Sequence, residues 1–126
     1  MSVKLYFDGG CRPNPGVIET AVIAGGKLFH RSDHGPGDNN DAEWLALIDA
    51  LQVARDLRLT DVTLLGDSAL VVGQANGTSR RIAPRFSEYI ASFRALADGF
   101  EIVRIRRIGR KQNLAGIALE RAAGRI

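Results

Sequence analysis

The order of apolar and polar residues predicts short strands first, followed by alternating helices and strands. Short apolar runs rich in β-branched residues are typical of strands. They occur at residues 3–7, 18–24, 27–30, 61–66 and 100–108. The second and third runs flank Gly25-Gly26, which is the spacing of a hairpin. We therefore predict five strands, and we expect the first three to form an antiparallel meander.

Between and after these runs, apolar residues recur at the three- to four-residue spacing of amphipathic helices. Helices are expected over residues 42–58, from residue 69, over residues 84–98 and over residues 113–123. In the first of them Leu47, Leu51 and Ala54 form the apolar stripe, and the polar residues 39–41 supply good N-caps. A strand, a helix and a second strand imply a parallel pair joined by a crossover. The expected fold class is α/β, with a mixed sheet of three antiparallel and then two parallel strands flanked by helices.

Composition places the chain among ordinary globular proteins. It is 45% hydrophobic and 25% charged, and its 126 residues suit one domain, so residues 1–126 are expected to fold as a unit. No apolar run approaches the ~20 residues of a membrane span, and the N-terminus lacks the layout of a signal peptide. The single cysteine, Cys11, excludes a disulfide framework and cysteine-based zinc sites. We expect a cytoplasmic monomer with no membrane attachment and no obligate protein partner.

The net charge of +3 hints at a polyanionic partner, and its distribution says more. Five basic residues lie between residues 104 and 111, and Arg80, Arg81 and Arg85 form a second group. Two separated basic clusters suit a surface that follows the phosphates of a nucleic acid. Solvated faces of strands and helices would carry the same charges, so charge alone leaves both interpretations open.

Three carboxylates occupy positions that a sheet can bring together. Asp8 follows the first strand and precedes Gly9-Gly10, Asp67 follows the strand at 61–66, and Glu43 lies on the inward side of the long helix. A turn residue and a helix-dipole partner are the ordinary interpretations of Asp8 and Glu43. If the three converge, the cluster requires a cation, because like charges at close range disfavour ionisation. Oxygen ligands without cysteine favour Mg²⁺ or Mn²⁺.

Four blocks of the sequence, in their order and spacing, resemble the type 1 ribonuclease H family. The blocks are Phe7-Asp8-Gly9-Gly10 with Asn14-Pro15-Gly16, Asn39-Asn40-Asp41-Ala42-Glu43-Trp44, Gly66-Asp67-Ser68-Ala69-Leu70-Val71-Val72 and Arg110-Lys111-Gln112-Asn113. They run in family order from near the N-terminus to the last helix, so the resemblance spans essentially the whole chain. The resemblance implies an RNase H-like fold and an endonuclease that hydrolyses the RNA strand of RNA–DNA hybrids, leaving 3′-hydroxyl and 5′-phosphate ends. It also implies two Mg²⁺ or Mn²⁺ ions in each site.

The resemblance also assigns roles to residues. Asp8, Glu43 and Asp67 would be the catalytic and metal-binding carboxylates, with Asp8 bridging the ions. Asn14 and Asn40 match residues that contact the RNA strand near its 2′-hydroxyls, the group by which a protein distinguishes RNA from DNA. The expected substrate-binding residues are Gly9, Asn14, Asn40, Ser68, Arg110 and Asn113.

The chain departs from the family in its last helix. The family usually carries a fourth carboxylate four residues after the asparagine that begins this helix, and Ile117 occupies that position. Asn113 and Glu120 lie about one turn before and after Ile117, so either is a candidate substitute ligand. Three functions stay open: the hybrid-cleaving enzyme, a weak or inactive module that binds hybrid or duplex, and another nuclease of the same fold. The three retained carboxylates and the two asparagines favour the enzyme.

Overall fold

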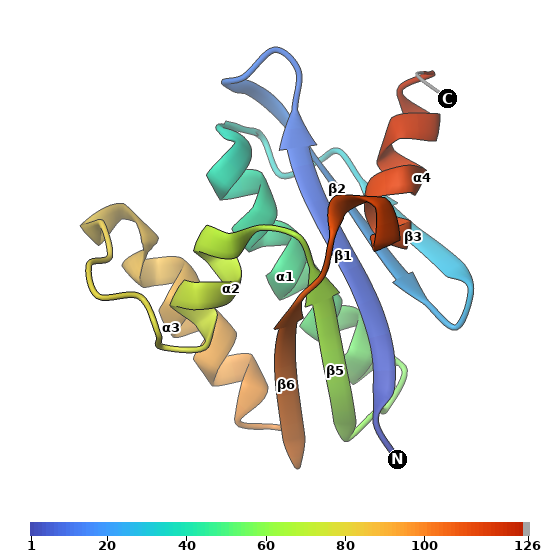
Figure 1. Ribbon diagram of the computed structural model, residues 1–126, viewed down its shortest axis with the longest axis vertical. Coiled ribbons are helices and arrows are strands. Elements are labelled where there is room, and N and C mark those ends of the chain that lie inside the picture. The colour runs from blue at the N-terminus through green and yellow to red at the C-terminus, as the bar shows by residue number, and fades with distance from the viewer. Residues whose placement is uncertain (125–126) are drawn as a thin grey trace.

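The computed structural model describes residues 1–124 and shows a mixed sheet with helices on both faces (Figure 1). The strands are β1 (Val3–Cys11), β2 (Gly16–Ala24), β3 (Lys27–Arg31), β4 (Pro36–Gly37), β5 (Asp61–Gly66) and β6 (Ile102–Arg107). The helices are α1 (Asn39–Asp56), α2 (Ala69–Ala75), α3 (Ser87–Ala97) and α4 (Leu114–Ala122), with 3₁₀ turns at Pro84–Phe86 and Arg110–Gln112. The main sheet has the order β3-β2-β1-β5-β6, antiparallel through β3, β2 and β1 and parallel through β1, β5 and β6. The predicted fold class is confirmed.

Two local predictions were wrong, and one short strand was missed. The first strand does not end at Phe7, because β1 continues to Cys11 by pairing with β2, while its pairing with β5 stops at Tyr6. The N-cap of α1 is not within residues 39–41; it is Asp38, whose carboxylate accepts from the N–H of Asp41 at 2.9 Å. The short strand β4, which pairs with β2, was not predicted.

Alternation along the strands divides the interior into two clusters. Leu5 and Phe7 of β1 face α1 and belong to the larger cluster, which also contains Trp44 and Leu64. The smaller cluster lies under α4 and contains Ala21, Ala115 and Leu119. Figure 1 shows α1 behind the sheet and α4 in front of it. No helix within residues 1–124 has the length and apolar character needed to cross a bilayer.

The first turn of α1 packs against β1 at Gly9, where no larger residue fits. A Cβ at Gly9 would collide with the carbonyl oxygen of Ala42 and would lie 3.0 Å from the backbone nitrogen of Glu43. A Cβ at Gly10 would meet only the Oδ1 atom of Asn39, at 3.7 Å. The missing side chain at Gly9 therefore sets how closely the helix approaches the strand.

Replacing Gly9 by alanine should destabilise the fold, because the new methyl group meets rigid backbone rather than a flexible side chain. We expect Gly9→Ala to lower the free energy of unfolding by about 2–3 kcal/mol. The matched variant Gly10→Ala should stay within about 0.5 kcal/mol of the native chain. Urea unfolding followed by circular dichroism measures both. Equal losses in the two variants would show that α1 can move away from β1 at little cost.

Candidate metal centre

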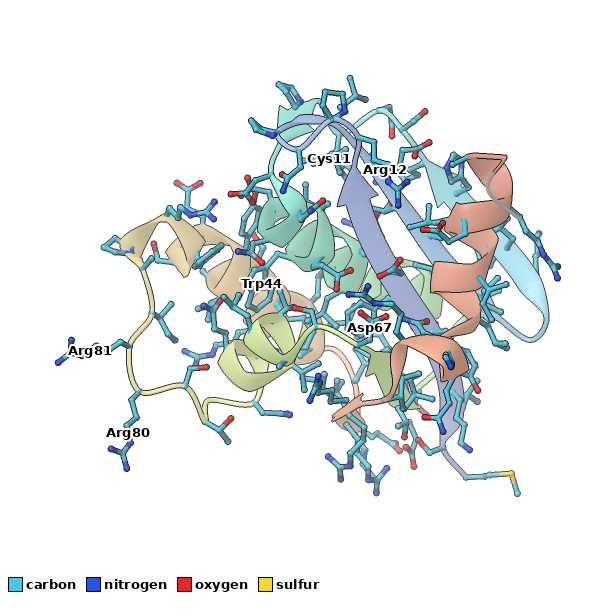
Figure 2. All side chains as sticks on the ribbon, turned by 45° about the horizontal axis from the view of Figure 1, so that its top comes forward. Cys11, Arg12, Trp44, Asp67, Arg80 and Arg81 are labelled. Carbon is cyan, nitrogen blue, oxygen red and sulfur yellow. The ribbon has the colours of Figure 1, made fainter. Side chains whose placement is uncertain are left out.

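Three carboxylates converge at one end of the parallel strand pair β1 and β5. Asp8 projects from β1, Glu43 comes from the start of α1, and Asp67 directly follows β5 (Figure 2 labels Asp67). One oxygen from each lies within 4.8 Å of the others. The structure thus brings together the three acidic side chains singled out from the sequence, and this group could hold a metal ion.

Glu43 is buried because α1 approaches the strand so closely. Its side chain is only 8% exposed, and its Oε1 accepts the backbone N–H of Gly9 at 2.6 Å. Burial first, and then the neighbouring charge of Asp8, raise the pKa of Glu43 well above its ordinary value. The helix therefore delivers a carboxylate to a place where its charged form is disfavoured.

The charged form of Asp8 is disfavoured as well. Burial, aided by the charge of Asp67, raises the pKa of Asp8 to about 6, although hydrogen bonds with Glu43 and Gly9 oppose the rise. A protein gains nothing from burying like charges unless a cation or proton neutralises them. The donors are all carboxylate oxygens, the ligand type of Mg²⁺ and Mn²⁺, so the residues present fit a hard divalent cation.

Helix α4 forms the other side of the site. A Cβ built on Gly116 would lie 3.4 Å from Oδ2 of Asp8, so the helix backbone passes directly beside that carboxylate. Ile117 lines the adjoining groove and offers no donor atom. Glu120 lines it too, with Oε1 3.4 Å from Nη2 of Arg12. Asn113 is fully buried, and its amide oxygen accepts the N–H of Ala115 as the N-cap of α4.

The carboxylates lie in an open groove of about 840 Å³. Of the predicted substrate-binding residues, the groove is lined by Gly9, Asn40, Ser68 and Arg110. Asn14 is not part of this lining: its Oδ1 accepts the backbone N–H of Asn39 at 3.1 Å and so ties the loop after β1 to the start of α1. The structure therefore gathers four of the six predicted contacts along the groove, with Asn113 beneath it.

The groove residues that the sequence did not predict include Asn39 and Arg12. Asn39 accepts the backbone N–H of Cys11 at 3.1 Å and holds the end of β1, yet the sequence suggested only helix capping for it. Arg12 also lines the groove and contacts Glu120 of α4 (Figure 2). Its place within the glycine- and proline-rich loop block was the available signal, since as a lone cation it belongs to neither basic cluster.

The two basic segments have mixed roles. Arg110 lines the groove, whereas Arg104 bonds to Asp61 at 3.0 Å. Arg85 is held by Asp38 and Asp41 at the start of α1, so its charge is partly used inside the protein. Arg80 and Arg81 extend from the loop between α2 and α3 into solvent (Figure 2).

The sheet order and the acidic cluster at its end define the RNase H-like class of proteins. The family model described as reverse transcriptase-like matches residues 27–123. This match covers well over half of the chain, and with the sheet order and the acidic cluster it shows that the chain belongs to the type 1 ribonuclease H family.

Three relatives are informative. Ribonuclease HI of Halobacterium salinarum is 35% identical to this chain, over 96% of this chain and 63% of that protein. The crystal structure of RNase H1 from the same archaeon superposes with a TM-score of 0.84 at 32% identity, and the match covers 98% of this chain and 99% of that chain. The bifunctional protein Rv2228c of Mycobacterium tuberculosis is 32% identical over 98% of this chain and 37% of its own. LC11-RNase H1, whose structure contains an RNA/DNA hybrid, has a TM-score of 0.83 at 27% identity over 94% and 93% of the chains. The chain thus spans 63% or less of the curated relatives named here.

Neutralising Asp8 should stabilise the metal-free protein at neutral pH. Its pKa rises from 3.8 to about 6 on folding, so the folded state binds more protons and stability falls as pH rises through this interval. In EDTA at pH 8 we expect Asp8→Asn to raise the free energy of unfolding by about 1–3 kcal/mol, since one pKa unit corresponds to about 1.4 kcal/mol. At about pH 4 or below the gain should vanish.

Urea unfolding at the two pH values measures this gain. The exposed residue Asp56 near the end of α1 supplies the control variant Asp56→Asn, which should show no such dependence on pH. A loss of stability on Asp8→Asn at pH 8 would contradict the prediction.

Proposed function

We propose that this protein is a ribonuclease H that hydrolyses the RNA strand of RNA–DNA hybrids. The observation that carries the proposal is the convergence of Asp8, Glu43 and Asp67, two of them with raised pKa values, at the floor of an open groove. Family membership and the hybrid bound in the LC11-RNase H1 structure support the choice of substrate. We further propose that two Mg²⁺ or Mn²⁺ ions occupy the site.

The side chains of this chain divide the work between holding ions and placing the substrate. Asp8, Glu43 and Asp67 would hold the ions, with Asp8 shared between them. When bound, such ions activate a water molecule and stabilise the leaving oxygen of a phosphodiester. The N–H of Gly9 fixes one oxygen of Glu43, and Arg110 at the groove wall can contact a phosphate.

The wall formed by the start of α1 suits recognition of RNA. Asn40 lines the groove there, and an amide offers both a donor and an acceptor, as contact with a 2′-hydroxyl requires. Asn14 lies on the neighbouring loop, joined to the backbone of Asn39. Ser68 caps α2 beside Asp67, and its hydroxyl accepts the N–H of Val71 at 3.2 Å. We propose that Gly9, Asn14, Asn40, Ser68 and Arg110 together bind the RNA strand.

One observation favours a second function, a hybrid-binding module without cleavage. Ile117 brings no oxygen to the site, and Glu120 already contacts Arg12. A site with three carboxylates would then bind nucleic acid and metal but turn over slowly. That the chain is a single domain acting as a cytoplasmic monomer stays a prediction from the sequence.

Cleavage of an end-labelled RNA–DNA hybrid tests the proposed function. We expect cleavage of the RNA strand with Mg²⁺ or Mn²⁺, and a loss of at least about a hundredfold on Asp8→Asn, because removal of a shared ligand affects both ions. Equal rates for the two proteins would reject the enzyme. Hybrid binding that weakens steeply with salt, without cleavage, would establish the binding module instead. Cleavage of duplex DNA or RNA at the same rate would indicate another nuclease.

Restoring a carboxylate at Ile117 should strengthen the site. We expect Ile117→Asp to raise the cleavage rate by about tenfold or more, which corresponds to at least about 1.4 kcal/mol of barrier. Calorimetric titration with Mg²⁺ should show tighter binding in the same variant. Ile117→Asn has a similar shape without the charge and should gain much less. Unchanged rate and affinity in Ile117→Asp would show that this side chain does not reach the ions.

A further inference from the structure

Asn113 lies where three elements of the metal centre meet. It is 0% exposed, which is unusual for an amide side chain. Its Nδ2 donates to the carbonyl oxygen of Phe7 at 3.0 Å and to Oδ2 of Asp67 at 2.9 Å, while its Oδ1 accepts the N–H of Ala115 at 3.1 Å. One side chain therefore joins β1, the end of β5 and the start of α4.

Helix capping explains only one of these three contacts. The N-cap needs an oxygen acceptor, and serine, threonine or aspartate supplies one as well as asparagine does. The NH₂ group adds what those residues lack: two donors fixed to the same short side chain. Both donors are used, one on a strand carbonyl and one on a carboxylate of the metal centre.

The hydrogen bond to Phe7 holds the Asn113 amide in place, so its contact with Asp67 has a fixed position. Phe7 directly precedes Asp8, so Asn113 is anchored to the backbone next to one carboxylate while it holds an oxygen of another. Asp67 lies beyond the last hydrogen-bonded residue of β5, where the chain turns into α2, so the strand pairing itself does not orient its side chain. Asn113 supplies that orientation.

We propose that Asn113 is a positioning residue of the metal centre, which fixes Asp67 relative to Asp8 through its NH₂ group. Helix α4 then contributes a hydrogen-bond donor to the site where a ligand is absent at Ile117. This positioning role differs from the metal-ligand and substrate-contact roles predicted for Asn113 from the sequence, and its amide oxygen accepts the N–H of Ala115. The inference rests on the proposed metal-dependent function.

The test compares Asn113→Ser with a matched asparagine elsewhere. Serine keeps the cap of α4 but cannot reach Asp67. Asn76 donates its Nδ2 to the carbonyl oxygen of Ile105 at 3.0 Å, a bond to a strand like that of Asn113 but with no carboxylate involved. We expect Asn113→Ser to weaken Mg²⁺ and Mn²⁺ binding by about 10–100-fold and to lower kcat at an unchanged KM.

The control Asn76→Ser should lower the melting temperature without changing metal affinity. Calorimetric titration without substrate, hybrid kinetics and thermal unfolding are the readouts. If Asn113→Ser lowers only the melting temperature, as Asn76→Ser does, Asn113 is a helix cap and the proposal is overturned.

A second variant covers the case in which Asn113→Ser does not fold. Asn113→Asp keeps the cap and the shape but turns an acceptor toward Asp67, so we expect kcat to fall at least about tenfold. A kcat equal to that of the native chain would overturn the proposal. Failure of the native chain to cleave hybrid would count against the proposed function alone, because the metal affinities of Asn113→Ser and Asn76→Ser would still decide the role of Asn113.

Discussion

The close contact between α1 and β1 at Gly9 is the constraint on which the site depends. It buries Glu43 against a strand backbone and sets that carboxylate beside Asp8, where both are harder to ionise. Bringing these negative charges together therefore destabilises the folded protein when no cation is bound. A divalent cation bound by these carboxylates would recover this energy, because it would neutralise their charges. A larger residue at Gly9 would separate the helix from the strand and lose both effects.

Helices on opposite faces of the sheet complete this arrangement. α1 brings Glu43 from one side, and α4 brings Asn113 from the other, so that Asp67 and Asp8 are held between them. The meeting point lies at the carboxyl end of the parallel pair β1 and β5, where α/β sheets commonly place their sites. Pairing between these two strands stops at Tyr6 and Leu65, so Asp8 and Asp67 both lie just beyond the last residues that the strands pair.

The fold class and the three acidic site residues could be predicted from the sequence, because both depend on local patterns: strand runs, helical spacing and carboxylates after strands. Features that depend on contacts between distant parts of the chain could not be predicted in this way. β1 continues past Asp8 only because β2 lies beside it, and the direction of the Asn113 amide depends on Phe7 and Asp67, far away in the chain. Asp49 lies outside the apolar stripe predicted for the long helix, yet it is buried and accepts from Thr20 at 2.7 Å.

The positive charge of the chain also affects the tendency of the protein to aggregate. The main sheet is open, and its two outer strands are β3 and β6. Both carry cations, with Lys27 and Arg31 in the first and Arg104, Arg106 and Arg107 in the second. An outer strand exposes unpaired backbone groups that invite another chain to add to the sheet, and charged side chains there oppose such growth. Part of the basic character that suggests a nucleic-acid partner therefore also protects the protein from self-association into aggregates.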